Sequence, residues 1–194
     1  MSVNQRASLR QGERVVHTLG HAHHSLDHFF SVLGQHGIEL LVDVRSRPGA
    51  KHAPHFNRRR LEGELTGRSI DYLWLGNHLG GRPDDDRFYD AHGYALYKPI
   101  SEQEWFMKAI GKVEYEAERR PTVLVCLEEE PERCHRYHLL GKVLVERELE
   151  VAHVRRDGST ESHDQVFERL GEGQIPLIGE TVWKSLTPQR DAGP

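Results

Sequence analysis

The sequence is short of cysteine and of long apolar runs, and each shortage excludes a class of protein. Its 194 residues contain two cysteines, which are too few for a disulfide framework, and a reducing compartment would keep them as thiols. No apolar run approaches the roughly 20 residues that cross a bilayer. Residues 1–13 are polar and lack the apolar core of a signal peptide. We therefore expect a cytoplasmic protein without membrane contact.

Excess positive charge is also missing. The formal net charge of -4 argues against a generally cationic nucleic-acid binder, although it leaves room for a local basic surface. No internal repeat or low-complexity segment is present. The hydrophobic content of 37% is enough for one domain with a full core, and no compositional break divides the chain.

What the chain does contain is an alternation of strand-like and helix-like segments. Five strands are predicted at residues 14–19, 38–45, 69–75, 122–126 and 151–154. The helices between and after them are predicted to begin at the N-caps Ser25, Asn57, Ser101 and Ser162 and near Cys134. This order predicts a single Rossmann-like α/β domain over residues 14–170, three layers thick, with a mostly parallel sheet of about five strands and helices on both faces. Residues 1–13 and 171–194 are predicted to be tails, the second partly ordered.

Both cysteines lie at one predicted strand-to-helix junction. After the fourth strand the chain reads Cys126-Leu-Glu128-Glu-Glu-Pro-Glu-Arg-Cys134-His135-Arg136. Ligands of doubly wound sheets bind outside the carboxyl ends of the strands. We therefore expect this junction to meet the residues after the first strand, 20–24, and those at the end of the second, 43–45.

A basic loop follows the second strand. Residues 45–60 carry six Lys or Arg and no acid, which suits a surface that faces phosphate or nucleic acid, with Phe56 or His55 stacking on a base. The alternative is a solvated loop that pairs with acids elsewhere in the protein.

Three classes of function fit these residues. In the first, the cleft is an enzyme site for an anionic small molecule, nucleotide-like substrate or nucleic acid. Its catalytic residues would be Asp43, Glu128 and His135. Its substrate-binding residues would be His21, Arg45, Arg47, Phe56, Asn57, Arg82 and Arg136. The alternative for these charges is a structural ion pair between Asp43 and Arg45, or between Glu128 and Arg136.

The second class is a thiol-dependent enzyme, either redox or sulfurtransferase-like, that uses Cys126 or Cys134. The third is a metal site in which Cys134 and His138, one helical turn apart, combine with His21, His23 or His24. The basic loop would also suit a nucleic-acid-binding module without catalysis. We expect the first class, adopt no metal ligand set, and assign neither a cofactor nor an oligomeric state.

Five motifs also occur in a fixed order. They are Thr18-Leu-Gly-His21 with Ser25, Leu41-Val-Asp43-Val-Arg45-Ser-Arg47-Pro48, Phe56-Asn57, Leu79-Gly80-Gly81-Arg82, and Cys126-Leu-Glu128 followed by Pro131 and Cys134-His135-Arg136. Over about residues 16–154 this set resembles the family called domain of unknown function 488. The resemblance implies a Rossmann-like fold in a prokaryotic cytoplasmic protein, and no established activity. One departure is Ala22-His23-His24, where the family usually carries a polar residue and Arg or Lys before the serine.

Overall fold

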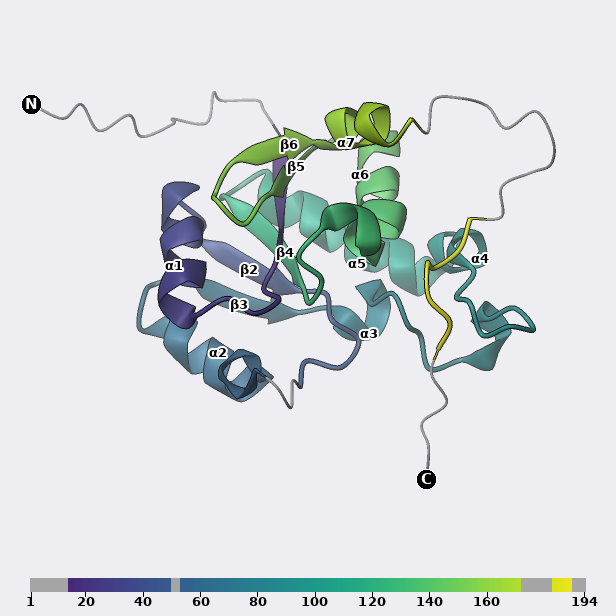
Figure 1. The fold of residues 1–194 in the computed structure, drawn as a ribbon, viewed down its shortest axis with the longest axis horizontal. Helices are drawn as coiled ribbons and strands as arrows, with labels where there is room; N and C mark the ends of the chain where they lie inside the picture. The colour runs from purple at the N-terminus through teal and green to yellow at the C-terminus, as the bar shows by residue number, and fades with distance from the viewer. Residues whose placement is uncertain (1–13, 50–52, 172–182, 190–194) are drawn as a thin grey trace, which may run out of the picture.

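The computed structural model describes residues 14–49, 53–171 and 183–189. Its centre is a six-stranded sheet in the order β3-β2-β4-β1-β5-β6 (Figure 1). The strands are β1 (Val15–Gly20), β2 (Leu40–Asp43), β3 (Asp71–Trp74), β4 (Thr122–Cys126), β5 (Glu150–Val154) and β6 (Thr160–Ser162). All neighbours are parallel except β6, which is antiparallel to β5. The predicted mostly parallel α/β sheet is confirmed, and the short edge strand β6 is an addition.

The remaining elements are helical. The α-helices are α1 (Leu26–Gln35), α2 (Arg58–Thr66), α3 (Gly76–Leu79), α4 (Tyr97–Ser101), α5 (Glu104–Ala117), α6 (Lys142–Glu146) and α7 (His163–Leu170). The short 3-10 segments are η1 (Pro54–Phe56), η2 (Asp86–Phe88) and η3 (Pro131–Arg133), and η4 (Arg136–Gly141) is a π-helix. In the described part of the chain, no helix is both long and apolar enough to cross a membrane.

Two separate hydrophobic clusters cover the two faces of the sheet. In β4, Val123 and Val125 join the cluster of α1 and α2, whereas Leu124 joins the cluster of α5 and α6. This alternation follows from the period of two in an extended strand. Because all five residues of β4 are buried, the strand lies at the middle of the three layers that Figure 1 shows.

Two predicted helix starts are confirmed. Ser25 accepts a hydrogen bond from the backbone N–H of His28 at the start of α1. Ser162 forms a full capping box with Gln165 at the start of α7. Both serines have an extended backbone conformation. Their hydroxyls accept from N–H groups of the first helical turn, which have no carbonyl acceptor within the helix.

The helix start predicted at the N-cap Ser101 is wrong. Ser101 is the last residue of α4, and its hydroxyl donates to the carbonyl of Lys98. Gln103 is the N-cap of α5. Asn57 does hold the N-cap position of α2, without a side-chain capping bond. A serine three residues before a glutamate fits both a helix start and a helix end, so the pattern alone did not decide between them.

The C-terminal residues 183–189 dock on the segment that precedes α4. The backbone N–H of Tyr97 donates to the carbonyl of Trp183 (2.9 Å), and Ser185 donates to Ala95 (2.8 Å). Lys184 forms an isolated antiparallel bridge with Leu96. Residues 84–96 therefore form a packed, largely irregular region, and residues 183–189 of the predicted tail pack against it. Residues 1–13, 50–52, 172–182 and 190–194 lie outside the described residues.

A pair of buried histidines joins β5 to α7. His153 Nδ1 lies 2.7 Å from the hydroxyl of Thr18, and its Nε2 lies 3.3 Å from His163 Nδ1. Burial, followed by the charge of His163, lowers the pKa of His153 from 6.5 to about 2. Burial likewise lowers the pKa of His163 to about 4. Both side chains are therefore neutral in the folded protein near pH 7.

These histidines make stability depend on pH. Below pH 6.5 the unfolded chain takes up protons that the folded chain refuses, so stability is lost as the pH falls from 6.5 towards 4. We expect each histidine to remove about 2 kcal/mol from the unfolding free energy by pH 5, measured by denaturant unfolding at pH 7 and pH 5. The variant His163→Gln should show a smaller loss, whereas the same change at His92, in an exposed turn, should not alter it. An equal loss in both variants would contradict this account.

Candidate functional site

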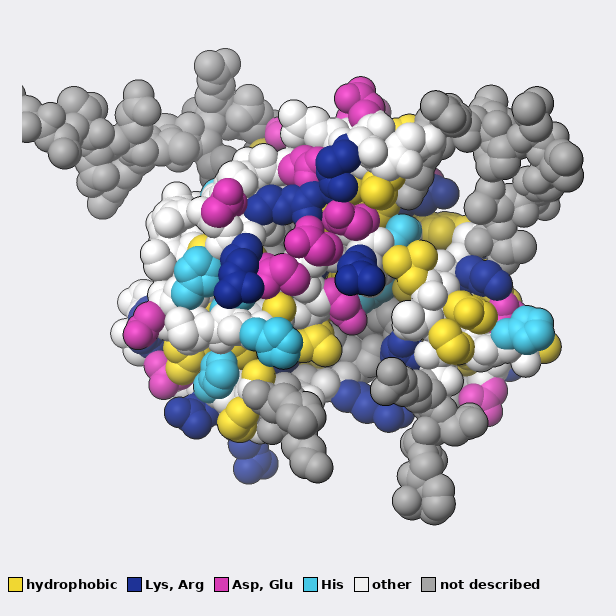
Figure 2. Space-filling view, viewed as in Figure 1, with side chains coloured by type: hydrophobic (Ala, Val, Ile, Leu, Met, Phe, Trp, Pro, Cys, Tyr) yellow, Lys and Arg dark blue, Asp and Glu magenta, His cyan; other side chains and the backbone are white. Residues whose placement is uncertain are grey.

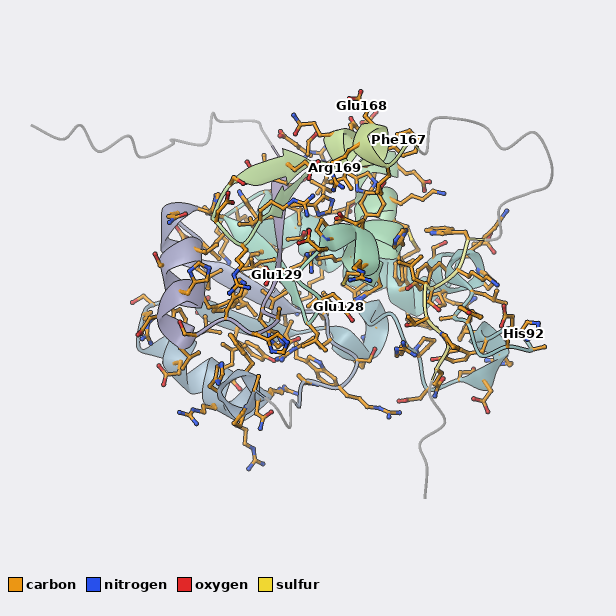
Figure 3. All side chains as sticks on the ribbon, in the orientation of Figure 1. His92, Glu128, Glu129, Phe167, Glu168 and Arg169 are labelled. Atoms are coloured by element: carbon orange, nitrogen blue, oxygen red, sulfur yellow. The ribbon has the colours of Figure 1, made fainter. Side chains whose placement is uncertain are left out.

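The predicted junction brings polar and thiol side chains together at the carboxyl end of β4. Cys126 is the last residue of β4, and the loop after it carries Glu128 and Glu129 (Figure 3). The loop after β1 runs beside it, because His21 donates to the carbonyl of Cys126 (3.0 Å) and Ala22 to that of Leu127 (2.8 Å). The end of β2 is tied to β4 by the bond from Val44 to Val125 (3.1 Å). Three strand ends therefore meet at one edge, as expected for a parallel sheet.

Four side chains at this edge form what we call the cysteine cluster: Cys126, Glu128, Cys134 and His135. One donor atom from each lies within 4.8 Å of all the others. The two Sγ atoms are 2.8 Å apart, and Glu128 Oε2 lies 2.7 Å from Cys126 Sγ and 3.2 Å from Cys134 Sγ. Both cysteines are free and only 2% exposed, while Glu128 is exposed. The cluster therefore has a buried sulfur side and a carboxylate side, formed by an exposed residue whose Oε2 is turned towards the sulfurs.

His135 turns a defined nitrogen towards the sulfurs. Its Nε2 lies 3.2 Å from the carbonyl of Val44, which can only accept, so Nε2 carries a proton. In the neutral ring, Nδ1 is then the unprotonated nitrogen. Nδ1 lies 3.7 Å from Cys126 Sγ and 3.5 Å from Cys134 Sγ. This is the arrangement of a metal-binding histidine, whose second nitrogen is normally held by a carbonyl or a carboxylate.

The groups of the cluster alter one another's proton affinity. Burial alone would raise the pKa of the Cys126 thiol, but the hydrogen bond with Cys134 and the nearby His135 hold it well below its usual range. Burial and the adjoining Cys126 raise the pKa of Cys134 and of Glu128. The pKa of His135 is raised because Cys126 outweighs the effect of burial. Of the two thiols, Cys126 is therefore the one that loses its proton more readily.

Arg136 supports the cluster from behind. Its side chain is completely buried, and its guanidinium donates to the backbone carbonyls of Glu128 and Glu129, the second at 2.5 Å. The sequence predicts that Arg136 binds phosphate or, as the alternative, forms an ion pair with Glu128. The structure instead directs the charge to backbone carbonyls of the loop. In this geometry the guanidinium holds the loop and does not face a ligand.

Asp43 and Arg45 form the structural ion pair that sequence analysis left as an alternative. Arg45 Nε and Nη2 donate to the two carboxylate oxygens of Asp43, at 2.8 and 2.5 Å. Arg45 Nη1 reaches His21 Nε2 (3.0 Å) and the carbonyl of Phe56 (2.9 Å), while the hydroxyl of Tyr72 donates to Asp43 (2.7 Å). All of these side chains except Tyr72 are buried. The network ties β2 to the loop before α2 and does not offer a free base or a free cation.

The remaining predicted binding residues divide into buried and exposed ones. Phe56 is fully buried and stacks on His21 at 4.2 Å between ring centroids, so its ring is not available to a base. The side chain of Arg47 is 76% exposed and lies 3.3 Å from Asp84. Arg82 is also exposed and donates to Thr187 (2.8 Å) and to the carbonyl of Pro188 (3.0 Å).

The metal set proposed from helical spacing does not assemble. Cys134 is extended, and His138 Nε2 bonds to the carbonyl of Glu132 (2.6 Å) instead of facing the sulfurs. His24 bonds to Glu129 (3.0 Å), and His23 is exposed. The ligand geometry comes instead from Glu128 and His135, which sequence analysis named only as catalytic residues. A sequence pattern that indicates this ligand set is the occurrence of two cysteines, a glutamate and a histidine within ten residues.

The glycine motifs make room for the cluster. A Cβ on Gly81 would lie 2.6 Å from Cβ of His135, and a Cβ on Gly20 would lie 1.8 Å from the carbonyl oxygen of Glu128. A Cβ on Gly80 would lie 2.2 Å from the hydroxyl of Ser46. These close approaches need glycine for space, since none of the three has a positive φ. Motifs far apart in the sequence therefore serve one site.

Acidic and basic side chains are interspersed on the face shown in Figure 2. On the β6 and α7 side, Arg155 and Arg169 pair with Glu132 and Glu161. The coloured side chains of this face therefore form no basic track along which a nucleic-acid backbone would bind. The basic residues 58–60 are exposed on α2, and Arg58 lies over the ring of Trp74 at 4.6 Å.

Comparison with known proteins gives one result. The family model described as domain of unknown function DUF488 matches residues 25–143, which is more than half of the chain and contains the whole cysteine cluster. The searches of curated proteins and of solved structures returned no match.

Gly20 provides a test of the packing behind the site. Its replacement by alanine should lower the unfolding free energy by about 1–3 kcal/mol, because the new methyl group collides with the backbone of Glu128. Gly34, near the end of α1, is the matched control, since nothing lies within 4 Å of a Cβ there. Gly34→Ala should be neutral or raise stability by up to about 1 kcal/mol. Denaturant unfolding of both variants measures the difference, and equal stabilities would refute the packing argument.

Proposed function

The chain belongs to the DUF488 family, and from the geometry of its cysteine cluster we propose that it is a metal-dependent protein whose centre binds one zinc-like transition-metal ion and serves a reaction. The observation that carries the proposal is the convergence of four donor atoms within 4.8 Å, from Cys126, Glu128, Cys134 and His135. Two thiolates, an imidazole and a carboxylate are the ligand types that Zn²⁺ binds in proteins.

The surroundings of the donors support metal binding over a chance grouping. Val44 fixes His135 in the tautomer that a metal requires. Arg136 fixes the backbone that carries Glu128. Gly81 lets the chain after α3 pack directly on His135. The His135 ring and the backbone that carries Glu128 are thus held by residues outside the four donors.

Two features favour a reactive centre over one that only stabilises the fold. The domain has two large hydrophobic clusters on opposite faces of the sheet, and Cys126 and Cys134 are the only proposed ligands among their members. Glu128 is the exposed residue of the cluster, so its side is the one from which water or a substrate would reach the centre. A catalytic metal site keeps such an accessible position, whereas a structural site is closed. The location at the carboxyl ends of the parallel strands is where this fold class binds substrates.

An anionic substrate remains our expectation for this site. Arg82 directly follows Gly81, which packs on His135, and Arg47 follows the end of β2 by four residues. Both guanidinium groups are exposed, so they can attract a negatively charged group that approaches the carboxylate side of the cluster. Glu128, once displaced from the centre by substrate, would serve as the acid or base. Nucleotides and other phosphorylated compounds are the substrate class that this arrangement suits.

Metal binding is tested with Co²⁺, which reports thiolate ligation by its absorption spectrum. The reduced, metal-free protein should bind about one equivalent, and Cys134→Ser or His135→Ala should weaken binding by at least about 100-fold. His92→Ala removes an imidazole from an exposed turn far from the cluster (Figure 3) and should bind like the wild type. The proposal would be refuted if the wild type bound Co²⁺ no more tightly than a variant in which both cysteines are replaced by serine.

Chelation separates a reactive centre from a structural one. Removal of the metal by a chelator under reducing conditions should leave the far-ultraviolet circular dichroism at 25 °C unchanged, because nearly all members of the two hydrophobic clusters lie outside the ligand set. The melting temperature should fall only by the amount that ligand release predicts by mass action. Global unfolding on chelation would show that the metal holds the fold, as in zinc fingers.

A further inference from the structure

The two sulfur atoms of the cluster are placed for a second chemistry. Cys126 Sγ and Cys134 Sγ are 2.8 Å apart, and no other cysteine exists in the 194 residues. We propose that a hydroperoxide converts Cys126 and Cys134 into a reversible disulfide, which acts as an oxidative switch on this centre. The metal-release part of the proposal rests on the proposed function, whereas the disulfide itself does not.

The backbone holds both cysteines in position for this bond. Cys126 ends β4 and is paired with Gly20 of β1 in the sheet register. Cys134 is extended between η3 and η4, and its backbone N–H donates to the carbonyl of Pro131 (2.9 Å). Arg136 anchors the intervening loop at Glu128 and Glu129. The sulfurs therefore meet without any large movement of either element.

Access to the sulfurs selects a small oxidant. Both cysteines are only 2% exposed, so a small oxidant reaches them faster than a bulky reagent does. The exposed residue beside them is Glu128, whose Oε2 contacts both sulfurs. A hydroperoxide is small enough to enter from this side. The carboxylate can accept the proton that leaves the attacking thiol.

The reaction balances with the peroxide as the only added reactant. One cysteine sulfur attacks a peroxide oxygen, the O–O bond breaks, and a sulfenic acid and water form. The second sulfur then attacks the first, the S–O bond breaks, and a second water leaves as the S–S bond forms. Two thiols and one hydrogen peroxide therefore give one disulfide and two water molecules. The two electrons lost by sulfur are gained by the peroxide oxygens.

Metal binding and the disulfide exclude each other. Sulfur in a disulfide is no longer a thiolate ligand, so oxidation removes Cys126 and Cys134 from the donor set together. Glu128 and His135 are then the only ligands of the cluster that remain. Two ligands do not hold a zinc-like ion against water or a chelator. Oxidation is therefore expected to release the metal, and reduction to restore the site.

The test treats the reduced full-length protein with hydrogen peroxide, in metal-free and Co²⁺-loaded form. In both forms we expect loss of both thiols, a Cys126–Cys134 crosslink in peptide mapping, and recovery of both thiols with dithiothreitol. The loaded form should also lose its cobalt absorption and release one ion per disulfide. In Cys134→Ser, peroxide should instead leave a sulfenic acid on Cys126 that dimedone traps.

Several outcomes would overturn the switch: thiols that survive the peroxide, direct oxidation to sulfinic acids, or a crosslink between two chains. A disulfide that forms while Co²⁺ stays bound would overturn the link to the metal.

The two proposals fail separately in this experiment. Metal-free protein that forms the crosslink but never binds Co²⁺ contradicts the metal centre alone. Protein that binds Co²⁺ and forms no crosslink contradicts the switch alone. His92→Ala removes an exposed imidazole outside the cluster and should form the disulfide like the wild type, which controls for general oxidative damage.

Discussion

The site depends on one buried charge. The guanidinium of Arg136 is completely enclosed and donates to the backbone carbonyls of Glu128 and Glu129. Burying a cation is costly unless its donors are matched. Here carbonyl oxygens of the loop accept from Nη1 and Nη2, while Nε has no hydrogen-bond partner among the described residues. The same contacts fix the turn that carries Glu128 back over the two sulfurs. Gly20 must lack a side chain because this loop passes directly over it. The positions of the cluster and of the β1 loop are thus set by one side chain.

The strands that carry this site could be predicted from the sequence, because a buried strand has a local apolar pattern. The strand at 122–126 is buried along its whole length, so its apolar, β-branched run identifies it without any tertiary information. Strand ends of a parallel sheet share one edge, so the meeting of the loops after β1, β2 and β4 could also be predicted. The edge strand β6 was missed because its three residues are polar or half-exposed. It exists only through its pairing with β5.

The roles of individual residues were less predictable, because they depend on contacts between distant segments. Arg45 and Arg136 look alike in the sequence, as arginines beside a strand end, and both suggest phosphate binding. In the fold both are buried and bonded to the protein itself. Phe56 in a basic loop suggests a stacking platform, yet it packs beneath His21. Burial of a polar or aromatic residue is decided by which element covers it, and that information is not local.

The ligand set illustrates how a small change in backbone geometry redirects chemistry. If an α-helix began at Cys134, then Cys134 and His138 would share a face. The chain instead stays extended at Cys134 and enters a π-helix at Arg136, so His138 turns to Glu132 and His135 takes its place beside the sulfurs. Wide helical turns of this kind occur frequently at functional sites. Here the wide turn has a physical consequence: Arg136 points back under the loop while the adjacent His135 faces the cluster. Two neighbouring residues therefore have different roles: Arg136 holds the loop, and His135 contacts the sulfurs.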